Sequence, residues 1–518
     1  MADSILFTEA IKVGYANAGP SITLGAGIYE GTVYPEAKVN IPLRMLNRHG
    51  LISGATGSGK TKTLQIIAEQ LAIQGVPSLL MDIKGDLSGI AAVGEASEKI
   101  LQRMLNIGIP FVPHASSVEF LSLSGEPGAR LRATLTEFGP VLLSKILGLN
   151  DTQQGVVALV FKYCDDKMLP LLDLDDFKKT LLFLTNEGKD EVKSEYGAIS
   201  SATTGTIIRK LLELEQQDAG LFFGEPSFEV DDLKKICNDG EGKISIIRLT
   251  DLQTRPKLFS TFMLQLLAEV FSSFPEAGDV DKPRLCIFID EAHLIFDEAS
   301  KALLDQINTT IKLIRSKGVG IFFITQNPSD VPAEVLSQLG LKIQHALRAF
   351  TAKDRKDIKL TSENFPLSDF YDIEALITSL GIGEALITVL NEKGIPTPLV
   401  HTMLRAPESR MDILTQAEID AILAESTLIP KYNKSINRVS AFEILNAKLQ
   451  EAMEKAPEKT GPFNTVPQSK NEEGSLIGDI VNSTTGRQIG RTVAREITRS
   501  LLGVLGLGGR SRRTKRWF

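Results

Sequence analysis

Apolar and polar residues alternate with two different periods along the first part of the chain. Residues 1–42 contain short β-branched and aromatic runs between glycines and prolines, which predicts a short N-terminal β segment. Leu51 and Ile52 precede a glycine-rich stretch, and apolar residues then recur at helical spacing from 62 to 74. A second buried-strand pattern covers 78–82. Because crossover connections are right-handed, we expect a βαβ unit whose two strands run parallel in one sheet.

The same patterns divide the rest of the chain. Leucine-rich helical periodicity dominates after residue 92, and strand and helix patterns alternate again after residue 280. This second alternation includes apolar runs at 285–289 and 321–325 and a helical pattern at 300–316, with later strand patterns at 385–390 and 398–403. We therefore expect an α/β fold whose core is interrupted by a large helical insertion.

The predicted parts are, in order, a short N-terminal β segment (1–42), the first part of the core (43–92), a mainly helical insertion (93–280), the second part of the core (281–405) and a helical C-terminal region (406–518). The last part includes a polar, proline-bearing linker at 455–474 and a helical pattern at 486–506. No repeat of fixed period is present in the sequence.

Positive charge is concentrated at the C-terminal end. The 518 residues carry a net charge of −7, yet nine basic residues stand against one acidic residue between 487 and 518. Residues 1–486 therefore carry −15, which argues against a broad nucleic-acid-coating surface but permits a narrow basic groove or pore. The tail is either a solvated end or an arginine-bearing helix that packs on a neighbour or tethers the protein to DNA, RNA or an acidic membrane.

Nothing in the sequence predicts export or a membrane span. The first residues lack a basic leader, and no apolar run approaches the roughly 18 residues that a spanning helix needs. The three cysteines, Cys164, Cys237 and Cys286, are too far apart for a disulfide framework or for paired zinc ligands. We expect a cytoplasmic protein.

One motif predicts nucleotide binding. It reads Gly54, Ala55, Thr56, Gly57, Ser58, Gly59, Lys60, Thr61, and it matches the pattern G-x-x-x-x-G-K-[ST] in full. The glycines let backbone N–H groups point at phosphates, and the helix that follows adds its positive N-terminal end. Lys60 would neutralise phosphate oxygens and the Thr61 hydroxyl would bind Mg²⁺. The strand before the motif and the helix after it favour this interpretation over a chance glycine-rich turn.

A pair of carboxylates follows the apolar run at 285–289. A parallel strand there would carry Asp290 to the Mg²⁺ side of the phosphates, and Glu291 could orient and deprotonate an attacking water. The alternative is a strand that is simply capped by acidic residues. The phosphate-binding motif favours the first interpretation, and a glutamate at 291 favours hydrolysis over simple nucleotide holding.

Other candidate residues have two interpretations each. Gln326, at the end of the run 321–325, is either a γ-phosphate or water contact or a plain polar strand end. Arg315 lies at the end of a predicted helix, where arginine often only complements the helix dipole, or it neutralises phosphate charge. Arg48 is a solvated charge or an arginine finger that acts across a subunit interface. The turn at 82–86 follows a strand, at the edge that faces the nucleotide in open α/β folds. It either contacts the nucleotide or is only a capped turn, and the two are equally expected.

The chain resembles the HerA/FtsK superfamily of RecA-like motors, and most of all the bacterial HerA-like helicase family. The residues that carry this resemblance, in the family's order and spacing, are Arg48 and His49, the motif at 54–61, the turn at 82–86, Asp290 and Glu291, and Thr325 and Gln326. The resemblance implies a hexameric ring with ATP at subunit interfaces and DNA in a central channel. It also implies that Arg48 acts from a neighbouring subunit and that Arg315 acts near the same nucleotide.

The expected function is therefore an ATP-hydrolysing motor that moves along double-stranded DNA as a homohexamer, with ATP and Mg²⁺ as cofactors. The alternative is a nucleotide-gated assembly or protein-handling ATPase without DNA translocation, which the charge of −15 makes credible. A small-molecule kinase fits less well, because Asp290, Glu291 and Gln326 suit attack by water. The segment before Arg48 is too short for the β-barrel with which HerA proteins dock a nuclease, which argues against that partner.

Overall fold

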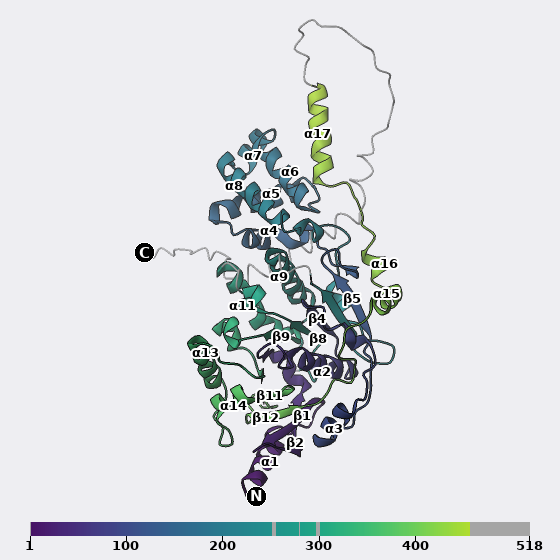
Figure 1. Ribbon diagram of the computed structural model, residues 1–518. Helices are drawn as coiled ribbons and strands as arrows, with labels where there is room; N and C mark the ends of the chain where they lie inside the picture. The colour runs from purple at the N-terminus through teal and green to yellow at the C-terminus, as the bar shows by residue number, and fades with distance from the viewer. Residues whose placement is uncertain (1, 251–254, 279, 297–300, 456–518) are drawn as a thin grey trace, which may run out of the picture. The chain divides into compact units, whose positions relative to one another are not determined.

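The computed structural model describes residues 2–250, 255–278, 280–296 and 301–455. They form two compact units, a core unit of residues up to 131 and 228–434, and a helical unit of residues 132–227 and 435–455 (Figure 1). The predicted linker at 455–474, apart from its first residue, and the whole basic tail lie outside the described residues.

A twelve-stranded sheet forms the centre of the core unit. Its strands are β1 (Ser21–Tyr29), β2 (Thr32–Pro42), β3 (Gly50–Ser53), β4 (Ser78–Asp82), β5 (Val118–Ser122), β6 (Ala129–Arg130), β7 (Ile244–Arg248), β8 (Leu285–Ile289), β9 (Val319–Thr325), β10 (Leu341–Gln344), β11 (Glu384–Thr388) and β12 (Val400–Leu404). The order across the sheet is β2-β1-β12-β11-β10-β3-β9-β8-β4-β7-β5-β6. Strands β10 to β6 in this order run parallel, and the other four pair antiparallel.

The predicted βαβ unit is present, but its strands are not neighbours. β3 and β4 run parallel in one sheet, and β9 and β8 lie between them. Every residue of these four strands is buried, as expected for parallel strands covered on both faces. Register brings the strand ends level, because Ile289 pairs with Phe323 on one side and with Met81 on the other. Asp290 and Asp82 therefore follow at the same edge.

Helices of the core unit cover this sheet. They are α1 (Ala2–Gly14), α2 (Lys60–Ile73), α3 (Glu98–Asn106), α9 (Pro256–Ser273), α10 (His293–Phe296), α11 (Lys301–Ile314), α12 (Ala333–Leu336), α13 (Ala352–Glu363), α14 (Ile373–Ser379), α15 (Gln416–Ala424) and α16 (Ile429–Tyr432). The first of them was not expected, although Phe7, Ile11 and Tyr15, all buried against β1 and β2, recur every four residues. None of the described helices is both long and apolar enough to cross a membrane.

The inserted part of the helical unit, residues 132–227, is shorter than the insertion predicted from the sequence, residues 93–280. The helical unit contains α4 (Leu135–Ile146), α5 (Asp151–Asp166), α6 (Leu174–Thr185), α7 (Lys189–Glu195), α8 (Ser201–Glu215) and α17 (Ala441–Lys455). Strands β5, β6 and β7, which lie within 93–280, belong instead to the core sheet. The chain returns to the helical unit after residue 434, where the N–H of Phe442 donates to Asp176 at 2.9 Å (Figure 1).

Candidate functional site

The glycine-rich loop between β3 and α2 depends on glycine for its shape. Gly54, Gly57 and Gly59 have φ values of 150°, 77° and 116°, which side-chain-bearing residues rarely adopt. A Cβ at Gly54 would lie 2.5 Å from the Cβ of His345. The loop is anchored at its start, since the N–H of Ala55 donates to the carbonyl of Ala346 at 2.8 Å. The sequence motif therefore forms the strand–loop–helix that phosphate binding requires.

The N-terminus of α2 supplies the donors of this loop. Its N-cap residue, Gly59, provides no side-chain cap, so the first N–H groups of the helix have no acceptor from a capping side chain. The Lys60 ammonium is buried over the loop, where it donates to the carbonyls of Gly54 (2.6 Å) and Ala55 (3.2 Å). Donors and positive charge thus meet at one point, as anion binding needs.

Three other charged groups of the site change the pKa of Lys60. Burial lowers the pKa of Lys60 and the nearby Lys84 lowers it further, whereas Glu291 and Asp290 act in the opposite direction. These groups come from α2, the turn after β4 and the end of β8, so the sheet edge does gather them around the loop. The expected convergence of strand ends on the loop is present.

Asp290 has an oxygen that suits a cation. Its side chain is buried, and Oδ1 accepts a hydrogen bond from the N–H of Glu291 at 2.9 Å. Oδ2 is also buried and has no hydrogen-bond partner among the described residues. Burial raises the pKa of Asp290 to about 7, and the positive charge of Lys84 opposes this shift. A buried carboxylate oxygen without a donor costs free energy unless a cation or proton binds it.

Magnesium fits this arrangement of residues. Mg²⁺ usually binds one or two protein oxygens and keeps water and phosphate oxygens as its other ligands. Asp290 and the half-buried Thr61, at the start of α2, are the candidates for these oxygens. The described residues contain no group of three or more His, Cys, Asp or Glu side chains that could hold a metal by themselves. The site therefore suits a cation that arrives with a phosphate group.

Glu291 is held by a cation, Lys84, for which the sequence pattern predicts no role of its own. The Lys84 ammonium forms an ion pair with its Oε1, and the Nδ1 of His293 lies 3.3 Å from its Oε2. Asp82 shapes the turn that carries Lys84, because it accepts the N–H groups of Gly85 (2.7 Å) and two following residues. The turn at 82–86 is thus capped and also reaches the site.

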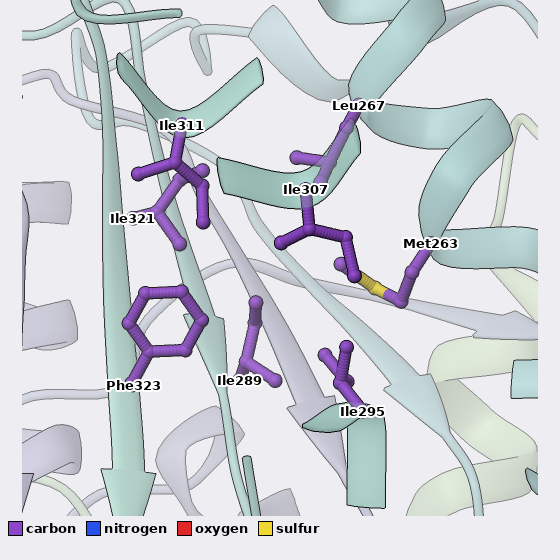
Figure 2. A pocket seen from close by; sticks show the side chains of 8 residues that line it. All are labelled: Met263, Leu267, Ile289, Ile295, Ile307, Ile311, Ile321 and Phe323. Carbon is purple, nitrogen blue, oxygen red and sulfur yellow. The ribbon is translucent and has the colours of Figure 1, made fainter. Parts of the chain in front are cut away.

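Eight apolar side chains line a small pocket beside the strands β8 and β9 (Figure 2). They come from β8, β9, α9, α10 and α11, and they are Met263, Leu267, Ile289, Ile295, Ile307, Ile311, Ile321 and Phe323. Ile289 lines this pocket and directly precedes Asp290, so the pocket packs the end of the strand that carries the two carboxylates.

The end of β9 lies between the loop strand and the carboxylate strand. Thr325 donates to Asp330 Oδ2 at 2.5 Å, and the N–H of Asn327 donates to the same oxygen at 3.1 Å. Between them, the Gln326 side chain is exposed at the sheet edge that carries the loop. The structure therefore brings Gln326 to the expected edge, and no hydrogen bond from the described residues holds its side chain there.

Arg48 and Arg315 lie at the opposite edge of the sheet. Arg48 is two residues before β3 and Arg315 is four residues before β9, whereas the phosphate loop follows β3. The carbonyl of Arg48 accepts the N–H of Gly340, which precedes β10, at 2.8 Å. The charge of Arg315 also acts on His49, whose pKa burial lowers to about 4. Within one chain, neither arginine is brought to the loop that carries Lys60.

The structure adds His345 to the residues of the site. It follows β10 and is fully buried beneath the loop, where its Nε2 lies 2.9 Å from the hydroxyl of Thr63. Burial lowers the pKa of His345 to about 4, so the ring is neutral at pH 7. No local signal marks this residue, because β10 has only four residues and includes Lys342 and Gln344.

A family model described as helicase HerA-like C-terminal matches residues 30–513. The chain belongs to this HerA-like family. A DNA double-strand break repair helicase HerA of Sulfolobus acidocaldarius is 23% identical to this HerA-like chain over 371 residues, covering 70% of this chain and 66% of the relative. The DNA import protein CedB of the same organism is 25% identical over 362 residues, covering 69% of this chain and 52% of that protein. The HerA-like chain thus spans less than two thirds of either relative.

A solved structure shows the same fold. The bacterial conjugative coupling protein TrwB, in a form with sulphate, has a TM-score of 0.50 and 14% identity, and the match covers 79% of the HerA-like chain and 94% of the coupling protein. At this identity the likeness concerns the fold alone. The expected RecA-like P-loop ATPase core, with a helical insertion and helical C-terminal region, is confirmed, and so is the resemblance to HerA-like proteins.

Proposed function

We propose that the protein hydrolyses ATP at the loop that carries Lys60. The observation that supports this most strongly is the buried Oδ2 of Asp290, which has no hydrogen-bond partner in the described part of the chain and lies at the edge where α2 leaves its first N–H groups without a capping side chain. Such a place stabilises a cation and an anion together, and MgATP supplies both. Bound magnesium would neutralise phosphate charge as it develops during hydrolysis.

Each residue has a distinct role in this proposal. The backbone of residues 54–59 and Lys60 bind the phosphates, and Thr61 and Asp290 hold the metal. Glu291 accepts a proton from the attacking water, and Lys84 and His293 keep its carboxylate in place. Gln326 contacts the γ-phosphate or the water. Both arginines act on the nucleotide of a neighbouring subunit.

The proposed motor moves along double-stranded DNA as a homohexameric ring. One of the two relatives is a DNA double-strand break repair helicase and the other is a DNA import protein, which supports DNA as the substrate. The separation of Arg48 from its own loop supports a site that two subunits complete. Arginine fingers supplied in trans raise turnover by roughly 10³- to 10⁵-fold in other phosphate-hydrolysing proteins.

Two measurements test this function. The Glu291→Gln variant should bind a fluorescent ATP analogue like the unaltered protein but lose its turnover, whereas Glu187→Gln, an exposed change in the helical unit, should keep both. Unaltered protein should also hydrolyse ATP faster with duplex DNA, with a DNA affinity that falls steeply as salt rises. Turnover retained by Glu291→Gln contradicts the assigned base. If no added DNA changes the ATP turnover, the result favours the alternative, a nucleotide-gated assembly or protein-handling ATPase.

A further inference from the structure

Helix α13 in the core unit has an asymmetric charge distribution. Ile358 is buried in a small apolar cluster with Leu347 and Ile377, which fixes the inner face of the helix. The two acidic residues of its first half are engaged in hydrogen bonds. Asp354 caps the helix by accepting the N–H groups of Phe350 (2.9 Å) and Thr351 (2.7 Å), and Asp357 accepts a hydrogen bond from a residue outside the helix.

Four cations occupy the other side of the helix. Lys353, Arg355, Lys356 and Lys359 are all exposed, and within the described part of the chain none of them forms an ion pair. Glu363, in the last turn, is exposed on the same side and is also unpaired. Because both acidic side chains of the first half are engaged in hydrogen bonds, the side of α13 that carries the four cations has a net positive charge, on a protein whose residues 1–486 carry −15.

We propose that this face of α13, defined by Lys353, Arg355, Lys356 and Lys359, binds the phosphate backbone of double-stranded DNA. The inference rests on the proposed function and adds the surface that would contact the substrate. Exposed lysines at a spacing of three residues lie along one side of a helix. Such a row of charges matches the row of phosphates along a DNA strand better than it matches a compact acidic patch on a protein. Contacts of this kind are independent of base sequence, as a motor that moves along DNA requires.

The same helix is joined to the nucleotide edge by a short chain of hydrogen bonds. Asn327 Nδ2 donates to Asp357 at 3.1 Å, and the N–H of Asn327 donates to Asp330 at 3.1 Å. Asp330 in turn accepts the Thr325 hydroxyl, next to Gln326. The Asp357–Asn327 hydrogen bond therefore links α13 to the end of β9 beside Gln326, so DNA on α13 would alter turnover through it.

Charge removal on α13 tests the surface. The Lys353→Ala/Lys356→Ala/Lys359→Ala variant is compared with Lys99→Ala/Lys189→Ala/Lys193→Ala, which removes three exposed lysines from α3 and α7. Binding of a fluorescent DNA duplex is measured between low and high salt, together with thermal melting and particle size. The α13 variant should bind at least about tenfold more weakly at 0.1 M salt, and its salt slope should fall by about 0.9 for each lysine that had been engaged. The control variant should bind like the unaltered protein.

The outcomes separate this inference from the proposed function. Equal DNA binding by the α13 variant and the control overturns the inference and leaves the motor intact. A loss of assembly in the α13 variant alone also overturns it, because the face is then a contact between subunits. Unaltered protein that binds no DNA at any salt overturns the DNA motor and the inference together.

The link to turnover is tested with Asp357. Asp357→Ala removes the acceptor for Asn327, whereas Asp357→Asn keeps an amide oxygen that can accept the same hydrogen bond. In Asp357→Ala the ratio of turnover with DNA to turnover without DNA should fall toward one while duplex binding is retained, and Asp357→Asn should restore the ratio. An undiminished ratio in Asp357→Ala overturns the link.

Discussion

Lys84 and Glu291 form an ion pair that joins the ends of two neighbouring strands of the sheet. Lys84 belongs to the turn after β4, and Glu291 follows β8 with a φ of 45°, a conformation that is unfavourable for a side-chain-bearing residue. Two contacts, with Lys84 and His293, orient its buried carboxylate. The proposed base is therefore positioned before any substrate binds.

Loss of this ion pair should reduce turnover more than nucleotide affinity. Lys84→Met removes the cation that contacts the Glu291 carboxylate and leaves its contact with His293, and a misplacement of about 1 Å can lower a rate by roughly 100-fold. Lys84→Arg retains a cation and should recover part of the loss. Steady-state turnover and ATP affinity are measured separately, with Lys99→Met on α3 as the control. A kcat of Lys84→Met equal to that of the control would contradict a positioning role.

Lys60→Ala should weaken ATP binding. A hydrogen bond to a charged group contributes about 1.5–3 kcal/mol, which corresponds to a drop of about 10- to 100-fold in affinity. Lys62→Ala is a matched control on the same helix, since the Lys62 ammonium donates to the Met411 carbonyl and to Gln65 instead. Titration with a fluorescent ATP analogue compares the two variants, and equal affinities would remove Lys60 from the phosphate site.

Arg48→Ala and Lys60→Ala should complement each other in mixed assemblies. Each variant alone lacks one half of every site, but a Lys60→Ala subunit can supply its arginine to the intact loop of an Arg48→Ala neighbour. An equimolar mixture that assembles at random should then recover about a quarter of the unaltered turnover. The mixture is prepared by letting folded subunits exchange without denaturant, and it is then assayed for phosphate release. A mixture as inactive as its two components would show that Arg48 does not act in trans.

Glu69 should make stability depend on pH. It is fully buried on α2 and accepts three hydrogen bonds from Glu408 and Ser409, yet burial raises its pKa from 4.5 to about 7. Between these values the folded protein keeps a proton that the unfolded chain has lost, so the free energy of unfolding falls as pH rises, and the loss is complete above about 7. Relative to Glu69→Gln, the loss should be about 3 kcal/mol. Denaturant titrations at pH 4.5 and 7.5 measure it, and parallel pH profiles for the two proteins would contradict it.

The parts of the core that the sequence predicts are those with a strong local pattern. The apolar strands β4, β8 and β9 and the helix that follows the phosphate loop lie close to their predicted positions, because the strands are buried along their whole length and the helix along most of its length. β10 contains only four residues, two of them polar, and such a short run does not differ from a loop in its pattern. Strands β5 and β7 are short runs within a helical context, so they were assigned to the insertion.

The candidate site was predictable as residue types at strand ends, but its contacts were not. A strand register is needed to know that Asp82 and Asp290 end at the same edge, and only the folded turn shows that Lys84 reaches Glu291. His345 depends on β10 and could not be found for that reason. The placement of Arg48 at the far edge follows from the parallel direction of β3, which the predicted βαβ unit already implied.

The positions of the two arginines at one edge and the phosphate loop at the other have a consequence for assembly. Subunits that complete each other's sites in this way must associate head to tail, and a two-fold dimer cannot satisfy both of its sites by the same contact. A chain of subunits that has not closed always ends with one loop that lacks arginines and one pair of arginines without a loop. Turnover per subunit would therefore rise when the last subunit closes the ring. Dilution below the concentration at which the ring closes would first abolish turnover at the terminal loop, because that loop loses its arginine-bearing neighbour.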